Sequence, residues 1–170
     1  MRARILAALV TGVLAASVPL DAQRASGICD VNSAAPLGLT LPGLDGKPVP
    51  LTRFKGKIVL VNFWATWCEP CKIEIPDFLD LYRQYRSKGV EIVGIDIEEP
   101  VEKVLPYVEQ MKITYPVLLT GDRHDEVAKA FGVDVGLPTT IVLNRDGTIC
   151  RRRVGLTRKT TFELLLKALL

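Results

Sequence analysis

Two cysteines three residues apart, Cys68 and Cys71, stand where a buried-strand pattern changes into a helical one. Residues 58–65 before them are almost continuously apolar and β-prone, which is typical of a strand covered on both faces. After them, apolar side chains recur at helical spacing from Ile75 to Tyr85. At a helix start, unpaired backbone N–H groups and the helix dipole lower the pKa of a cysteine thiol. The spacing therefore predicts a pair for thiol–disulfide exchange, with Cys68 as the nucleophile.

Other uses of the pair need features that the sequence lacks. A structural zinc site takes four ligands, and the sequence offers only Cys29, Cys150 and His124 beyond the pair. A structural bridge across one helical turn closes almost no loop and stabilises little. We therefore expect no metal and no cofactor. A copper-binding module, with His124 as its one candidate histidine, and a non-catalytic interaction domain remain as alternatives.

The N-terminus predicts the compartment. Arg2 and Arg4 precede an apolar stretch over 5–20, and small residues follow, with Ala22 as a candidate cleavage point. We interpret residues 1–22 as an export signal. An uncleaved membrane anchor is the alternative, although the stretch is short for a spanning helix. Either way we expect the folded part in the bacterial periplasm or on the extracytoplasmic face of the membrane, where disulfides persist.

The remaining cysteines, Cys29 and Cys150, lie in an N-terminal arm (23–34) and in a late strand. A bridge between them would clip the arm onto the sheet, and closing so long a loop could stabilise the fold by about 4–5 kcal/mol. The alternative is two separate thiols, which are a liability in an oxidising compartment. We expect the bridge.

Composition excludes one class of partner. The formal net charge of the 170 residues is +3, which is too small to indicate binding to nucleic acid or to an acidic membrane. The run 151–153 is all arginine and is interpreted as a solvated strand end, with a surface for an acidic partner as the alternative.

The rest of the chain predicts one domain over 35–170. Asp45 and Gly46 mark the turn of an N-terminal β-hairpin. Periodicity and turn residues then predict elements in this order: a strand over 90–97, a helix over 100–111 that Pro106 should distort, a strand over 116–120, a helix over 125–131, strands over 139–143 and 148–154, and a final helix capped by Thr160 or Thr161. This order predicts an α/β fold, with a central mixed β-sheet flanked by helices on both faces.

The motif in this setting resembles the thioredoxin-like superfamily, and within it the exported thiol–disulfide oxidoreductases of the TlpA/ResA/CcmG type. The residues that carry the resemblance are 63–72, Glu74, Pro76 and 136–140. By that resemblance Pro138 is cis, and the Leu137 backbone pairs with an extended segment of the substrate. The sequence alone favours a trans Pro138 that begins a strand. Trp67 is expected to shape the surface around the cysteines.

Two positions bear on proton transfer. Thioredoxins carry a buried Asp six residues before the first cysteine, and here Asn62 stands there, which cannot titrate. The resemblance places a glutamate three residues after the second cysteine, and here that is Glu74. If Glu74 is partly buried, its pKa is raised and it can take the proton of Cys71. The alternative is an exposed helix carboxylate paired with a basic side chain.

These features together predict an enzyme, a protein-disulfide reductase or oxidoreductase. We expect Glu69, between the cysteines, to oppose the Cys68 thiolate and so favour the reducing direction. The resemblance implies protein substrates such as apocytochrome c or copper-delivery proteins, and a membrane thiol protein as electron donor.

Overall fold

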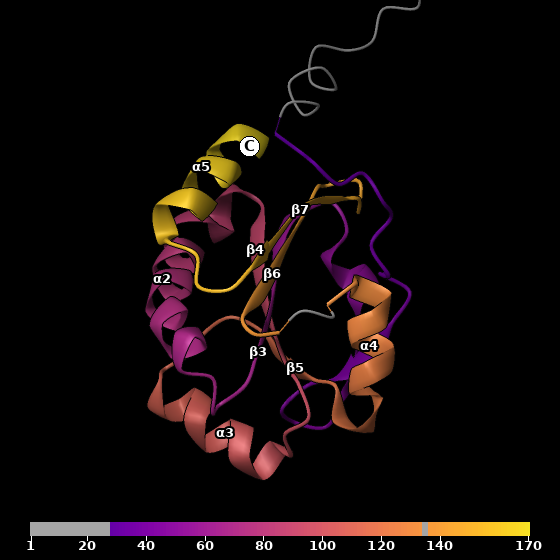
Figure 1. Cartoon of the computed structure of the whole chain (residues 1–170), viewed down its shortest axis with the longest axis vertical. Helices are drawn as coiled ribbons and strands as arrows, with labels where there is room; N and C mark the ends of the chain where they lie inside the picture. The colour runs from indigo at the N-terminus through magenta and orange to yellow at the C-terminus, as the bar shows by residue number, and fades with distance from the viewer. Residues whose placement is uncertain (1–27, 134–135) are drawn as a thin grey trace, which may run out of the picture.

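A five-stranded mixed sheet forms the centre of the protein (Figure 1). The computed structural model describes residues 28–133 and 136–170, so residues 1–22, interpreted above as an export signal, and the first part of the arm lie outside the described residues. The order of the strands is β5–β4–β3–β6–β7. Their bounds are β3 Ile58–Trp64, β4 Val90–Asp96, β5 Val117–Leu119, β6 Thr139–Leu143 and β7 Ile149–Val154. The strands β3, β4 and β5 are parallel, and β6 and β7 are antiparallel additions, as expected for a mixed sheet.

The expected N-terminal hairpin is present as β1 (Thr40–Pro42) and β2 (Pro48–Pro50). The two strands pair antiparallel around a turn in which Gly46 takes a positive φ of 74°, a conformation that glycine adopts without a steric cost. A bridge from Gly43 to Leu118 joins this hairpin to β5 at the edge of the central sheet.

Helices cover both faces of the sheet, as predicted (Figure 1). Alternate residues of β3 divide between two apolar clusters: Ile58, Leu60 and Trp64 belong to one, and Val59, Val61 and Phe63 to the other. Helices α2 (Glu69–Tyr85), α3 (Val101–Gln110) and α5 (Lys159–Leu169) pack on the first face. Helix α4 (His124–Phe131), the short helix η1 (Leu51–Phe54) and the hairpin pack on the second. Two further short helices are η2 (Arg86–Lys88) and η3 (Gly121–Arg123).

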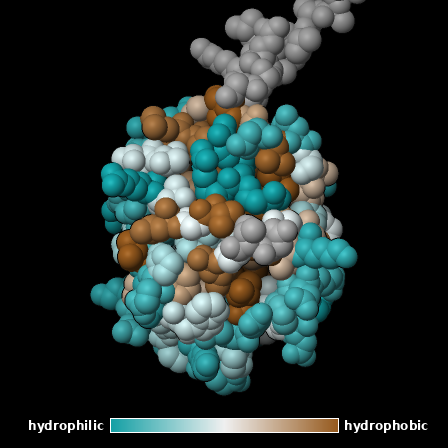
Figure 2. Space-filling model, viewed as in Figure 1, coloured by the Kyte–Doolittle hydropathy of each residue, from teal (hydrophilic) through white to brown (hydrophobic). Residues whose placement is uncertain are grey.

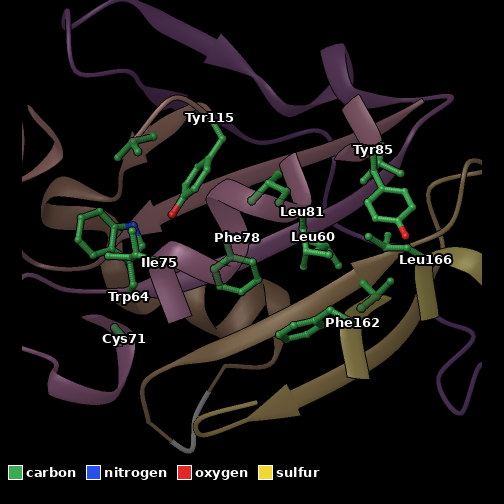
Figure 3. Packing of buried hydrophobic residues seen from close by; sticks show 14 of the residues in the cluster. Leu60, Trp64, Cys71, Ile75, Phe78, Leu81, Tyr85, Tyr115, Phe162 and Leu166 are labelled. Atoms are coloured by element: carbon green, nitrogen blue, oxygen red, sulfur yellow. The ribbon is translucent and has the colours of Figure 1, made fainter. Parts of the chain in front are cut away.

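The first cluster places the end of α2 that carries the cysteines against the sheet. Figure 3 shows Cys71 at the edge of this cluster, with Phe78 and Phe162 packed deeper inside it. The rings of Phe78 in α2 and Phe162 in α5 lie 5.3 Å apart between centroids, so the two helices share apolar contacts. This packing fixes α2 relative to β3, and therefore fixes the loop between them.

The start of α5 differs from the prediction. Neither Thr160 nor Thr161 caps the helix, which begins at Lys159 with Arg158 as N-cap residue and without a side-chain cap from it. Instead, the Lys159 N–H donates to the Asp77 carboxylate of α2 at 3.1 Å. A carboxylate from the neighbouring helix thus satisfies an N–H group that a capping threonine would otherwise have bonded.

The described part of the arm, residues 28–34, is fastened to β7. Cys29 and Cys150 form a disulfide with an S–S distance of 2.04 Å, and the N–H groups of Asp30 and Val31 both donate to the Cys150 carbonyl. The Arg151 guanidinium donates to the Ile28 carbonyl and lies 3.2 Å from an Asp30 carboxylate oxygen. The bridge is therefore the one predicted from the sequence.

The interpretation of 151–153 as a solvated strand end is wrong for two of its three arginines. Arg151 binds the arm, and Arg152 donates to the Phe131 carbonyl at the end of α4 at 2.8 Å. Both side chains therefore tie parts of the same chain to β7. Among the described residues, no helix has the length and apolar character needed to cross a membrane.

Candidate active site

Cys68 and Cys71 form a disulfide at the start of α2, with an S–S distance of 2.01 Å. Cys68 is the N-cap residue of the helix, with an extended backbone (φ −80°, ψ 101°), and its sulfur accepts the Cys71 N–H at 3.3 Å. Pro70 fits the first turn because no N–H bond is required there. Both cysteines are buried in this oxidised form. A thiolate at Cys68 would face the same N–H donor, which stabilises the anion.

Glu74 lies one helical turn beyond Cys71 and is 2 % exposed. One carboxylate oxygen accepts the Thr157 N–H at 2.7 Å, and the other is buried without a hydrogen-bond partner in the described part of the chain. Burial raises the pKa of Glu74 to about 7, with a smaller contribution from the charge of Asp77, while the Thr157 N–H opposes the rise. The alternative of an exposed carboxylate paired with a basic side chain does not describe this residue.

The cis proline expected from the resemblance is present, since the Leu137–Pro138 peptide bond is cis. Pro138 is buried, and its carbonyl accepts the Gly155 N–H at 2.7 Å, which joins the start of β6 to the end of β7. Leu137 is partly buried and packs against both apolar clusters, including the one that contains the active-site cysteines. Leu137 therefore contacts the apolar core on the side of the disulfide as well as the core on the opposite face of the sheet.

Asn62 is buried within the sheet, where its side-chain amide donates to the Thr140 hydroxyl of β6 at 3.0 Å. Because this amide bonds a neighbouring strand and cannot titrate, it leaves Glu74 as the buried acid on the cysteine helix.

The two tryptophans of the motif divide between core and surface. Trp64 is 1 % exposed and packs with Tyr107 of α3, with ring centroids 5.6 Å apart. Trp67, directly before Cys68, is 60 % exposed. Other exposed apolar side chains are Ile73 on α2 and Val154 and Leu156 at the end of β7. Figure 2 shows apolar surface across the middle of its view, where α2 and the segment after β7 meet.

Glu69 and Lys72 flank the disulfide on the exposed side of α2. Their side chains form an ion pair at 2.5 Å, so the charge expected to oppose the Cys68 thiolate is partly balanced.

Sequence reasoning missed a second acidic contact, on the loop between β3 and α2. The Glu99 carboxylate accepts both the N–H and the hydroxyl of Thr66, at 2.6 and 2.8 Å. Glu99 follows β4, and its own N–H donates to the Asp96 carboxylate at 3.3 Å. A polar residue at the end of each of two parallel strands is the signal that could have indicated this meeting.

His124 does not join the cysteines. It begins α4, on the opposite face of the sheet, with its Nε2 atom 3.3 Å from carboxylate oxygens of Glu98 and Asp125. Within residues 28–133 and 136–170, no group of three or more histidine, cysteine, aspartate or glutamate side chains is placed to hold a metal ion.

The proteins that this chain resembles include enzymes of thiol–disulfide exchange. A family model described as AhpC/TSA matches residues 31–152. The chain belongs to this family of thioredoxin-like proteins. Among curated relatives, the thiol-disulfide oxidoreductase ResA of Bacillus thuringiensis subsp. konkukian is 37 % identical over 138 residues, which is 81 % of this chain and 78 % of that protein.

Solved structures give the same grouping. A thiol:disulfide interchange protein of the thioredoxin family from Chlorobium tepidum TLS superimposes with a TM-score of 0.72 and 34 % identity, over 81 % of this chain and 96 % of that one. The thioredoxin domain of a thiol-disulfide oxidoreductase from Bacteroides vulgatus gives a TM-score of 0.74 and 28 % identity, over 82 % and 98 % of the two chains. The chain is a thioredoxin-fold thiol–disulfide oxidoreductase, and Cys68 and Cys71 form its Cys-x-x-Cys pair.

Proposed function

We propose that the protein is an exported reductase that donates electrons to disulfides of other exported proteins, with Glu74 as the proton acceptor of the cycle. The observation that carries the proposal is the burial of Glu74 one turn from Cys71, with a pKa of about 7. A group with this pKa exchanges protons readily at neutral pH. The relatives named as thiol-disulfide oxidoreductases support the exchange reaction itself.

The cycle begins with both cysteines reduced. The Cys68 thiolate attacks one sulfur of the substrate disulfide, forms a mixed disulfide, and releases the other substrate sulfur as a thiolate that takes a proton from water. Cys71 then transfers its proton to the Glu74 carboxylate and attacks the sulfur of Cys68. This attack forms the Cys68–Cys71 disulfide and releases the second substrate thiolate. Two electrons pass to the substrate, and Glu74 returns its proton to solvent.

The substrate is held beside the cysteines by Trp67, Leu137 and Pro138. Exposed Trp67 offers apolar contact area, and the Leu137 backbone offers hydrogen-bonding groups to an extended segment. We infer that the substrates are oxidised Cys-x-x-Cys-His segments of apocytochrome c or the cysteines of copper-delivery proteins. A thiol protein of the membrane would return the disulfide to the dithiol form.

The location proposed for this reaction is the bacterial periplasm or the extracytoplasmic face of the membrane. The Arg2 and Arg4 residues before an apolar stretch support export, and the Cys29–Cys150 bridge supports an oxidising compartment. Fractionation of the native host, with the mass of the mature protein measured, separates a cleaved signal from a retained anchor.

A reduction assay with defined peptides tests the proposal. The reduced protein is mixed with a synthetic Cys-x-x-Cys-His peptide in its disulfide form, and with insulin as a general protein disulfide. We expect stoichiometric reduction of both, and no reduction by the Cys68→Ser variant. The Cys71→Ala variant should accumulate a mixed disulfide between Cys68 and the peptide, which mass spectrometry detects. A protein that fails to reduce either disulfide, although its own pair is fully reduced, would contradict the proposal.

A further inference from the structure

The loop that presents Cys68 is held by a carboxylate from the neighbouring strand. Strands β3 and β4 run parallel with Trp64 opposite Asp96, so the loops that follow them lie side by side. Glu99, which is 6 % exposed, accepts the backbone N–H of Thr66 at 2.6 Å and its hydroxyl at 2.8 Å. We call this pair of hydrogen bonds from Thr66 to Glu99 the clamp. Because Thr66 lies two residues before Cys68, the clamp fixes the chain next to the active site.

A second carboxyl group, that of Asp96, contacts Glu99 of the clamp. Asp96 is completely buried, and one of its oxygens accepts the Glu99 N–H at 3.3 Å. Its other oxygen, Oδ2, is buried without a partner among the described residues. A buried carboxylate would need donors for that oxygen, whereas a protonated carboxyl group can itself donate. The Glu99 side chain is the group that acts on this carboxyl group, both through its charge and as a hydrogen-bond partner.

The electrostatics agree with this arrangement. Burial raises the pKa of Asp96 to about 8, and the charge of Glu99 raises it further in the same direction, against the opposing effect of the Glu99 N–H. Two carboxyl groups in contact cannot both ionise without strong repulsion, so one of them holds a proton at neutral pH. Both oxygens of Glu99 already accept hydrogen bonds from Thr66, whereas Asp96 Oδ2 has no donor among the described residues, so the proton belongs on Asp96.

Other charged groups around the clamp lie in two surface hollows. Lys72 of α2 and Lys103 and Tyr107 of α3 share one hollow with Thr66. Glu98, Asp122 of η3 and His124 of α4 share the other with Glu99. Asp96 itself is covered by the strands on either side of it, opposite Trp64 of β3 and Leu119 of β5, neither of which carries a charge.

We propose that Asp96, as the protonated hydrogen-bond partner of Glu99, is a positioning residue for the active-site loop. By donating to Glu99 it keeps a single negative charge at the clamp and holds Glu99 on Thr66. When Asp96 loses its proton, two adjacent carboxylates repel each other, Glu99 withdraws from Thr66, and the geometry at Cys68 loosens. The inference rests on dithiol–disulfide exchange at Cys68, and it does not depend on the substrates or the compartment proposed above.

The test compares pH profiles for reduction of a small aromatic disulfide by the reduced protein, because this probe needs no protein docking surface. The wild-type rate, corrected for the measured thiolate fraction, should fall about tenfold as the pH rises through 8, since small displacements of reacting groups cost this much or more. Asp96→Asn keeps a donor toward Glu99 but cannot ionise, so it should abolish the fall. Asp96→Leu removes the donor and should show the low rate already at pH 7.

Two further variants make the result decisive. Thr66→Val keeps the shape of the side chain but removes one of the two hydrogen bonds to Glu99, and it should lower the rate severalfold at every pH. Glu98→Gln removes a carboxylate from the same loop but outside the clamp, and it should leave the wild-type profile unchanged. Infrared difference spectra of wild type against Asp96→Asn should show the C=O band of a protonated carboxylic acid at pH 7, lost as the pH rises through 8.

Three results would overturn the proposal: a fall above pH 8 that persists in Asp96→Asn, a Glu98→Gln variant that removes it equally well, or the absence of a protonated-acid band. If the Asp96 variants do not fold, the infrared titration of the Glu74→Gln variant, which removes the other buried acid with a raised pKa, and the Thr66→Val rate decide. An unchanged rate in Thr66→Val would then reject the clamp as a determinant of Cys68 geometry. For each variant, reduction of insulin shows that the exchange reaction itself is intact.

Discussion

The Glu74 carboxylate accepts the backbone N–H of Thr157 across the contact between α2 and the segment before α5, at 2.7 Å. The acid one turn from Cys71 is thus oriented by a backbone group 83 residues away in sequence. This single hydrogen bond leaves the other carboxylate oxygen of Glu74 buried and without a partner among the described residues. Burial of the carboxyl group raises the pKa of Glu74, against the opposing effect of the Thr157 N–H, and the helix places this acid one turn from Cys71.

Replacement of Glu74 by glutamine should slow the second step of exchange. Glutamine keeps the size and the acceptor for the Thr157 N–H but takes no proton, so the release of the substrate should fall by about 10²-fold at pH 7, as for loss of a general base. Stopped-flow measurement of mixed-disulfide decay gives the rate. In wild type that rate should rise with pH through about 7 as Glu74 ionises, and the variant should lack this rise. Glu69→Gln, on the exposed side of the same helix, is the matched control and should keep the rise.

Stability should decrease as the pH rises from about 4 to about 8. The pKa of Glu74 is raised to about 7 and that of Asp96 to about 8, so the folded protein binds both protons more tightly than the unfolded chain. The free energy of unfolding therefore falls between the ordinary carboxyl pKa values and these raised ones, and levels off above them. Urea unfolding of the oxidised protein at a series of pH values measures the slope. The double variant Glu74→Gln with Asp96→Asn should be nearly flat over this range, and a slope as steep as that of wild type would contradict the assignment.

Removal of the Cys29–Cys150 bridge should cost stability and spare activity. The bridge joins residues 121 apart in sequence, and loss of such a native disulfide costs about 2–5 kcal/mol. The double variant Cys29→Ala with Cys150→Ala should therefore unfold at lower urea concentration while reducing insulin at the wild-type rate. The double variant Cys68→Ala with Cys71→Ala is the counterpart, because its bridge spans only three residues. It should lose all activity and little stability.

Trp67 should matter for protein substrates more than for small ones. It is 60 % exposed and directly precedes Cys68, so Trp67→Ala removes contact area without opening a cavity in the core. We expect KM for the Cys-x-x-Cys-His peptide to rise about tenfold, the change expected for loss of an aromatic anchor worth 1–2 kcal/mol, while kcat changes little. Reduction of a small aromatic disulfide should proceed at the wild-type rate. An equal loss with both substrates would indicate that Trp67 acts on Cys68 and does not bind the substrate.

Features set by neighbouring residues could be predicted from the sequence. The apolar run 58–64, the helix after Cys68 and the turn at Gly46 each depend on contacts or conformations within a few residues. The family resemblance added the cis bond at Pro138, which local preference alone would have assigned as trans.

Features that depend on tertiary contacts were either missed or predicted wrongly from the sequence. The capping of α5 was assigned to its own threonines, because nothing in the local sequence shows that Asp77 of α2 meets Lys159. The clamp between Glu99 and Thr66 joins residues 33 apart that meet only when β3 and β4 pair in parallel. Arg151 was interpreted as part of a solvated strand end, yet its side chain donates to the carbonyl of Ile28 in the distant arm.

The attachment of the arm to β7 also determines where the arm lies relative to Cys68. Ile149, the first residue of β7, pairs with Leu143 of β6, and Leu143 pairs with Val59 at the beginning of β3. Cys68 follows the other end of β3. The length of β3, roughly 20 Å, therefore separates the two ends. A segment that continues from residue 28 would therefore attach at one end of the sheet, and Cys68 would lie at the opposite end. If residues 1–22 are retained as an anchor, the end that carries Cys68 is then the one farther from the point of attachment.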